Sequence, residues 1–368
     1  MSPADDGFAA SPAGARRAAL ALAAGRPLAA NEVVRREGLD YDAFLAHREV
    51  HRLSGATAGG GGERRWSLIE KTTEGPATAS RYLRENAERE HAAYTGGLLG
   101  DLAPRVRAPQ LLGAHEAADG HLALWLEDVV DESPRPRDAT SILAAAEDLG
   151  TLAGRHLGRV PDLPWLFTGW IARHAQPEAV PASLRLLDRA GTRTTDVLGH
   201  RIGEVRRLIA AQPRLRRALE ALPSTLCHHD AVGANILHAG GETVLLDWES
   251  VGPGPCGADL ASLLFASVRR GDASAEVVLP LWDLAVDAYC EGVAQEHGRV
   301  DVPAIRSTLD AAVCLRWKLA VDVIEALERR VPVRRGSAPE ETAEQALEEL
   351  RQLTGLLLGT ARRLLWGP

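Results

Sequence analysis

The chain of 368 residues contains little lysine and little cysteine. The first shortage makes each lysine a candidate functional residue, and the second bears on the cellular compartment. Only two of its 42 basic residues are lysines, Lys71 and Lys318, so arginine is the default cation and a lysine indicates a specific need. The four cysteines show no paired spacing, which argues against a disulfide framework. We therefore expect a reduced, cytoplasmic setting.

Long apolar runs are also missing. No segment reaches the roughly 18 apolar residues that a membrane-spanning helix requires. An Ala-rich run at 18–24 follows two arginines, but the polar residues after it favour an amphipathic helix over an export signal. The net charge of −8 argues against nucleic acid or an anionic membrane as the main partner and suits a cationic or neutral polar one.

The order of apolar patterns predicts two lobes, because the chain is longer than one typical domain. Short alternating runs before residue 127 indicate strands, and they follow a mixed segment at 33–46 with a helical turn or two. Amphipathic helices dominate after residue 131, and we expect continuous ones at 201–222 and 302–330. We predict an α+β fold with a small β-rich N-lobe and a larger helical C-lobe. The predicted divisions are an N-terminal extension, partly helical, at 1–46, an N-lobe at 47–127 and a C-lobe at 128–368.

The strongest motif is His228-x-Asp230 followed five residues later by Asn235, with Asp247 after an apolar strand. Phosphoryl transfer to a hydroxyl needs a carboxylate that orients the hydroxyl and accepts its proton, and oxygen ligands for Mg²⁺. Asp230 provides the carboxylate, while Asn235 and Asp247 provide the metal ligands. The chain has only three asparagines, so chance would produce this spacing in well under roughly one such chain in ten.

A structural interpretation competes with the catalytic one. The same segment could be a β-hairpin with polar turns, in which Asp230 and Asn235 only cap backbone amides. The additional carboxylate at Asp247, directly after Val244-Leu245-Leu246, favours the catalytic interpretation.

Three motifs together resemble the aminoglycoside phosphotransferase and choline kinase-like family, which shares the bilobal fold of protein kinases. They are His228-His229-Asp230-x4-Asn235, Val244-Leu245-Leu246-Asp247-Trp248-Glu249 and Gly257-Ala258-Asp259-Leu260-Ala261. The resemblance covers roughly residues 45–300. It implies that Asp230 is the catalytic base, that Asn235 and Asp247 hold Mg²⁺, and that ATP or GTP is the phosphate donor.

Two histidines of the catalytic loop have different expected roles. We assign His228 to the site and expect it to brace the loop by hydrogen bonds rather than to act chemically. Protein kinases carry arginine between this histidine and the catalytic aspartate, whereas the resembled family usually has glycine. His229 departs from both patterns, which leaves the outer contacts of the loop open. Asp259 is expected to cap a helix or brace the loop.

The resemblance also assigns nucleotide-binding residues in the first lobe. Lys71, at the end of an apolar strand, resembles the lysine that binds the α- and β-phosphates. That lysine needs a carboxylate on the following helix, and Glu90 matches the family pattern best. Glu88 and Glu85 remain alternatives, because neighbouring positions of one helix are hard to separate from sequence.

Main-chain groups should complete the nucleotide site. Ser54 and Gly55 are expected in a loop that covers the phosphates, because glycine permits close backbone approach to anionic oxygen, with Gly59–Gly62 as the hairpin turn. Glu127 and Val129 resemble the interlobe hinge of the family. There the Glu127 carbonyl and the Val129 N–H should bind the base of the nucleotide.

The sequence thus predicts a small-molecule kinase that phosphorylates a hydroxyl, with no nucleic acid or membrane partner. The acceptor could be an antibiotic or a sugar-like compound, and a metabolic sugar or amino-alcohol kinase is the alternative. A non-catalytic nucleotide-binding module would usually lack Asp230, Asn235, Asp247 or Lys71. A protein kinase would need an activation segment after Asp247, where a Gly- and Pro-rich loop follows instead.

Overall fold

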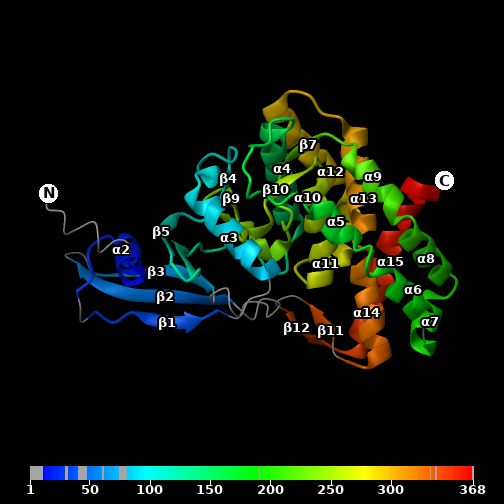
Figure 1. The fold of residues 1–368 in the computed structure, drawn as a ribbon, viewed down its shortest axis with the longest axis horizontal. Coiled ribbons are helices and arrows are strands. Elements are labelled where there is room, and N and C mark those ends of the chain that lie inside the picture. Colours follow the sequence, from blue (N-terminus) through cyan, green and yellow to red (C-terminus); the bar gives the residue numbers. More distant parts are fainter. Residues whose placement is uncertain are drawn as a thin grey trace. The chain divides into compact units, whose positions relative to one another are not determined.

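A computed structural model describes residues 11–29, 32–39, 48–59, 62–73, 81–189, 191–331, 333–335 and 338–366. The chain divides into two compact units. Unit 1 contains residues 1–101, 107–131 and 244–249, and unit 2 contains residues 102–106, 132–243 and 250–368. Unit 1 is small and built on an antiparallel sheet, whereas unit 2 is larger and mainly helical (Figure 1). The predicted α+β fold of the protein-kinase type is confirmed.

Unit 1 contains a five-stranded sheet and two principal helices. In the sheet the strands lie in the order β1-β2-β3-β6-β5, and each neighbouring pair is antiparallel. The elements of this unit are α2 (Pro12–Ala24), β1 (Arg35–Gly38), β2 (Arg48–Gly59), β3 (Gly62–Thr73), α3 (Arg81–Thr95), the short helix η2 (Leu98–Gly100), β5 (Leu111–Glu116) and β6 (Leu122–Glu127).

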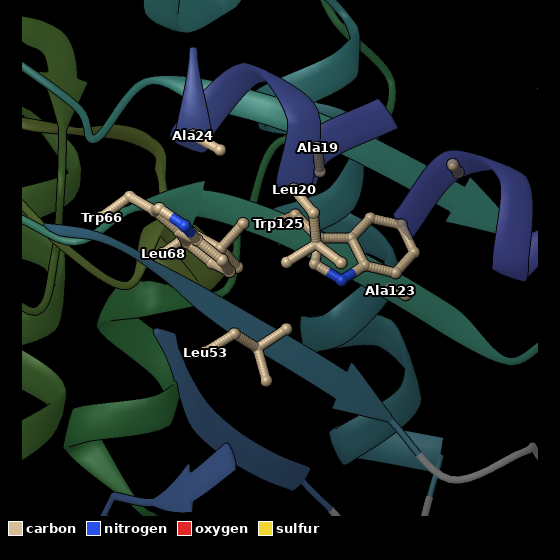
Figure 2. Close-up of a cluster of buried hydrophobic side chains, with 9 residues drawn as sticks. Ala19, Leu20, Ala24, Leu53, Trp66, Leu68, Ala123 and Trp125 are labelled. Carbon is tan, nitrogen blue, oxygen red and sulfur yellow. The ribbon is translucent and has the colours of Figure 1, made fainter. Parts of the chain in front are cut away.

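Helices α2 and α3 lie on opposite faces of this sheet. Successive residues of a strand point to opposite faces, and Glu70 and Lys71 are consecutive in β3. Glu70 pairs with Arg16 of α2 at 2.7 Å, whereas Lys71 pairs with Glu90 of α3. The α2 face holds a core of small side chains from the helix against two tryptophans of the sheet, Trp66 and Trp125 (Figure 2).

Unit 2 is a helical assembly with short strand pairs. Its helices are α4 (Ala139–His156), α5 (Trp170–Ala175), α6 (Val180–Asp188), α7 (Thr192–Leu198), α8 (Arg201–Ala210), α9 (Gln212–Glu220), η3 (Gly233–Asn235), α10 (Ala258–Ala261), η5 (Ser262–Ala266), α11 (Ser267–Arg270), α12 (Ala275–His297), α13 (Val302–Leu315), α14 (Trp317–Arg329), α15 (Ala343–Ala361) and η6 (Arg362–Trp366). Its strands are β7 (Ser224–Cys227), β8 (Ile236–Ala239), β10 (Gly252–Pro255), β11 (Val333–Arg335) and β12 (Ala338–Glu341). Three elements belong partly to each unit: β4 (Val106–Arg107), β9 (Glu242–Leu245) and η4 (Trp248–Ser250).

The α4–α12 pair supports the strand that leads into the loop at residues 228–235. The two helices approach so closely that a Cβ on Gly150 or Gly292 would lie 2.1 Å from a main-chain oxygen of the other helix. Next to them, the Thr225 hydroxyl of β7 donates a hydrogen bond to the Ala153 carbonyl of α4. Strand β7 also pairs with β10, so its end at Cys227 is held from two sides.

Several expected elements differ in the structure. The segment 33–46 was expected to be mixed or helical, but β1 forms at 35–38 because its backbone pairs with β2; residues 40–47 lie outside the described ranges. Ser54 and Gly55 were expected in a loop, yet they lie within β2, opposite Ser67 and Trp66. The expectation was wrong because β2 and β3 stay paired as far as Gly59 and Gly62. The expected hairpin turn between these two glycines lies outside the described residues.

Two helices expected to be continuous are divided. The segment 201–222 forms α8 and α9, and the break precedes a proline at the start of α9, where proline is favoured because the first helical N–H groups have no helical partner. The segment 302–330 forms α13 and α14, and the interruption is Arg316.

Candidate active site

The nucleotide-binding candidates of unit 1 form a buried ion network around Lys71. Its Nζ lies 2.7 Å from Oε1 of Glu90 and 3.1 Å from Oδ1 of Asp247. Among the three acidic residues considered on α3, Glu90 is the one whose ion pair with Lys71 is observed, while Glu85 pairs with Arg81 at the surface. The side chains of Glu90 and Asp247 are 3% and 7% exposed, so both carboxylates depend on the lysine for charge compensation.

Asp247 occupies a tight turn after β9. Its φ is +62°, in the left-handed region that L-residues adopt infrequently. The following residue fixes this turn, because the Trp248 indole is fully buried and its Nε1 donates to the Leu245 carbonyl at 2.8 Å. The backbone thus holds the Asp247 carboxylate toward Lys71.

The other unit 1 candidates lie in strand β2 and at the end of β6. Ser54 and Gly55 are ladder residues of β2. The Glu127 carboxylate accepts two hydrogen bonds from Arg107, at 2.6 and 3.1 Å, and its N–H donates to the Gln110 carbonyl. Val129 lies two residues after the end of β6, outside any helix or strand. The binding of nucleotide by main-chain groups of Glu127 and Val129 remains a prediction.

The candidate catalytic loop of unit 2, residues 228–235, holds Asp230 and Asn235 together. The Asn235 side-chain amide donates to both the Asp230 carbonyl and its Oδ2, each at 2.9 Å. Asn235 is buried, whereas Asp230 is partly exposed. This arrangement leaves the Asn235 side-chain oxygen for another interaction and orients a carboxylate that solvent can reach.

The side chains of Asp259 and His228 accept hydrogen bonds from main-chain N–H groups and hold this loop in place. The two carboxylate oxygens of Asp259 accept the N–H groups of His228 and His229, at 2.9 and 2.7 Å. His228 is fully buried, and its Nδ1 accepts the Asp230 N–H at 3.3 Å. The expectation that Asp259 braces the loop is therefore confirmed. Burial raises the pKa of Asp259 to about 6, against the opposing effect of these two N–H groups.

His229 fills the position where the resembled family usually has glycine. Its φ is +67°, its ring stacks on Trp170 at 5.0 Å between centroids, and its Nε2 lies 3.1 Å from the Pro253 carbonyl. Burial lowers its pKa to about 3. His229 is therefore a neutral, packed side chain of the loop, not an exposed acid or base.

A buried arginine reaches the same loop from the junction of α13 and α14. The Arg316 guanidinium donates to the Ser262 hydroxyl at 2.6 Å, and this hydroxyl donates to the His229 carbonyl at 3.3 Å. The guanidinium also lies over the Trp170 ring, 5.4 Å from its centroid. Burial lowers the pKa of Arg316 to about 10, while the Asp230 and Asp259 carboxylates raise it.

Within the described ranges, Cys227, His229 and Asp259 are the group whose side chains could together ligate a metal, with ligand atoms within 4.8 Å of one another. This trio suits Mg²⁺ poorly, because Mg²⁺ prefers oxygen ligands. Burial also raises the pKa of the Cys227 thiol well above its usual value, and both Asp259 oxygens already accept N–H groups. We therefore assign no Mg²⁺ site to this trio, and Asp259 serves as a brace of the loop.

The structure thus places the predicted residues in two groups. Lys71, Glu90 and Asp247 meet in unit 1, and His228, Asp230 and Asn235 meet in unit 2. Two further features were not predicted from the sequence: Arg316, and a buried set on unit 1 formed by Asn86, Arg89 and Glu249. Glu249 belongs to the Asp247 motif and Asn86 is one of three asparagines, and these were the available signals.

The sequence profile of the Phosphotransferase enzyme family matches residues 58–300, a range that includes all of these side chains except Arg316. The chain belongs to this family. It is a phosphotransferase with an alcohol group as acceptor, a small-molecule kinase of the aminoglycoside phosphotransferase and choline kinase type. A search of curated protein sequences found no match.

Solved structures of this phosphotransferase fold resemble the whole chain at low identity. A microcompartment-associated aminopropanol kinase is 15% identical over 94% of this chain and 96% of its own, with a TM-score of 0.52. A choline/ethanolamine kinase family protein from Mesorhizobium loti is 15% identical over 98% of both chains, with a TM-score of 0.51. The amicoumacin kinase hAmiN, solved with AMP-PNP, Ca²⁺ and Ami, is 13% identical over 89% of this chain and 88% of its own, with a TM-score of 0.50.

These likenesses establish the fold and leave the acceptor open. In the described part of the chain, no helix combines the length and the apolar character that crossing a membrane would require.

Proposed function

We propose that this phosphotransferase transfers the γ-phosphate of a nucleoside triphosphate, ATP or GTP, to a hydroxyl of an antibiotic or sugar-like acceptor. The observation that carries the proposal is the Asp230–Asn235 pair, in which a partly exposed carboxylate is held by a buried carboxamide on one short turn. Asp230 acts as the base, and His228 braces it from behind. Phosphoryl transfer depends on such positioning and on charge neutralisation more than on covalent chemistry.

The second part of the proposal concerns the donor and its metal. Lys71, held by Glu90, binds the phosphates, and Asp247 and Asn235 supply carboxylate and amide oxygens of the kind that Mg²⁺ prefers. When bound, Mg²⁺ neutralises charge on the phosphates. Ser54 and Gly55 are residues of β2, and their approach to the phosphates stays a prediction, whereas the main chain at Glu127 and Val129 binds the base.

Replacement of Asp230 tests the proposed chemistry. The Asp230→Ala variant should lose turnover by about a thousandfold, because a positioned general base contributes roughly 10²–10⁴. It should still bind nucleotide, since Lys71, Glu90 and Asp247 are unchanged. Consumption of ATP and GTP is measured with Mg²⁺ across a panel of aminoglycosides, other hydroxylated antibiotics, sugars and amino alcohols.

The acceptor panel also distinguishes an antibiotic kinase from a metabolic kinase.

Asp283→Asn is the matched control for Asp230→Ala, because Asp283 is an exposed carboxylate of unit 2 that pairs with Arg306. It should keep the turnover of the unaltered chain. Normal turnover in Asp230→Ala would contradict the base assignment, and turnover restricted to simple sugars or amino alcohols would favour a metabolic kinase.

A further inference from the structure

A buried polar cluster in unit 1 connects helix α3 to the turn that carries Asp247. The Asn86 amide donates to the Glu249 carboxylate at 3.0 Å, and the Arg89 guanidinium donates to the Glu249 main-chain carbonyl. Arg89 also donates to the Asn86 side-chain oxygen at 3.1 Å. All three residues are at most 9% exposed, so their hydrogen bonds form in a region of low polarity, where each counts for more.

The positions on α3 explain why this cluster bears on the nucleotide site. Asn86 and Glu90 are four residues apart and therefore lie on the same face of the helix, with Arg89 beside them. Glu90 reaches Asp247 through Lys71, while Asn86 and Arg89 reach Glu249, two residues further along the turn. Helix α3 thus holds the same turn at two points.

The electrostatics favour a fixed arrangement of this cluster. Burial lowers the pKa of Arg89, and the nearby Glu249 carboxylate opposes that effect. A buried guanidinium remains charged and needs its partners, so separation of α3 from the turn would leave a charge and several hydrogen-bonding groups without compensation. In protein kinases, by contrast, the corresponding lysine–glutamate pair and metal-binding aspartate are brought into place by activation-loop phosphorylation.

We propose that Asn86, Arg89 and Glu249 form a positioning clamp that keeps Glu90, Lys71 and Asp247 assembled for the metal–nucleotide complex without a separate activation step. The inference rests on the proposed function, because it assumes that Glu90, Lys71 and Asp247 serve the binding of nucleotide and Mg²⁺. The clamp residues themselves act through Asp247 and Glu90 and need not touch the substrate.

The test compares two substitutions of one clamp residue. Glu249→Ala removes the acceptor of the Asn86 amide and should weaken binding of a fluorescent ATP analogue about tenfold, or about 1.4 kcal/mol. It should also raise the Mg²⁺ concentration needed for half-maximal binding. Glu249→Gln keeps a side-chain oxygen for Asn86 and should stay within about twofold of the unaltered chain. Asn86→Ala carries the same expectation as Glu249→Ala should that variant fail to fold.

A matched control separates positioning from general stability. Arg269→Met breaks another buried ion pair, with Glu349 at 2.8 Å in unit 2, and should lower the Tm without changing the affinity for the analogue. A Glu249→Ala variant with a lower Tm but unaltered affinity and Mg²⁺ dependence would overturn the clamp alone. An unaltered chain that binds no nucleotide with Mg²⁺ would overturn the proposed function and the clamp together.

Discussion

Arg316 is the residue whose role in the catalytic loop is least evident from its position in the chain. It lies 86 residues after Asp230, yet its guanidinium is buried, contacts Ser262 and Trp170, and lies near the Asp230 carboxylate. Ser262 and Trp170 in turn contact His229, the neighbour of Asp230. Arg316 therefore positions the loop through Ser262 and the His229 carbonyl. Asp259 holds the same loop by accepting the N–H groups of His228 and His229.

Substitution of Arg316 should reduce kcat more than nucleotide affinity. We expect Arg316→Met to lower kcat about tenfold, because the loop loses a buried charge-assisted hydrogen bond and small displacements of a base are costly. Affinity for nucleotide should stay within about twofold, since Lys71, Glu90 and Asp247 belong to unit 1. Steady-state kinetics and direct nucleotide binding measure the two quantities.

Two further variants complete this experiment. Arg316→Lys keeps a cation and a donor and should recover part of the lost kcat. Arg306→Met removes a more exposed arginine of α13 and should leave kcat unchanged. A drop in Tm with unchanged kcat in Arg316→Met would show a role in stability alone.

For single residues of the candidate site, the sequence allows some to be proposed and not others, and the reason is physical. The sequence allows Asp230, Asn235 and Asp247 to be proposed as a group, because the proposed chemistry requires those side chains at a short spacing along the chain. The hydrogen bond from Asn86 to Glu249 joins positions 163 apart, and the sequence around each residue does not show that the two form a pair. Buried polar pairs of this kind depend on how distant elements pack, which one sequence does not specify.

Among the secondary elements, the pairing of β2 with β3 explains why residue 55 is a glycine, and this explanation differs from the expected one. Gly55 lies opposite Trp66, and a Cβ at this position would be 2.5 Å from Cζ2 of the indole. The missing side chain therefore makes space for a tryptophan of the core (Figure 2). The sequence suggested instead that this glycine allows the backbone to approach phosphate.

The variant Gly55→Ala separates these explanations. If the indole requires the space, we expect a loss of about 1–3 kcal/mol in stability from overpacking, seen as a lower Tm. Nucleotide affinity should change by less than about threefold in the fraction that remains folded. Ser54→Ala is the control and should leave the Tm within about a degree. A normal Tm with a large loss of nucleotide affinity would instead support the phosphate-approach role.

The helix boundaries show which elements a sequence can locate. The break between α8 and α9 has a sequence signal, a proline at the second position of α9. The expectation of one long helix at 201–222 did not take this proline into account. The break at Arg316 has no glycine or proline and arises where the guanidinium turns into the interior. Local propensity can predict the first break but not the second.

For the molecule as a whole, two histidines of unit 2 with lowered pKa values make stability depend on pH. Burial lowers the pKa of His229 to about 3 and that of His174 well below its usual value. An unfolded histidine takes up a proton near pH 6.5, so between pH 6.5 and 3 the unfolded state binds more protons. The stability that these neutral histidines provide is thus complete above pH 6.5 and is lost as the pH falls.

Asp259 acts in the opposite direction over part of this range. Its pKa is raised to about 6, so the folded state binds more protons than the unfolded state between pH 6 and 3.8. That difference stabilises the folded chain as the pH falls through this window. It offsets part of the loss from His229, and the lowered pKa of His174 adds to the loss.

The His229→Gly variant isolates one of these contributions, and glycine suits the positive φ of +67°. From pH 7 to pH 5, His229 should cost the unaltered chain about 2 kcal/mol of stability that the variant does not lose. The drop in Tm over this interval should therefore be smaller in the variant by a few degrees. His200→Gln, at an exposed position, should show the same drop as the unaltered chain. Equal drops in all three proteins would mean that His229 is protonated in the folded state, and that the stacked, neutral ring assigned to the loop is wrong.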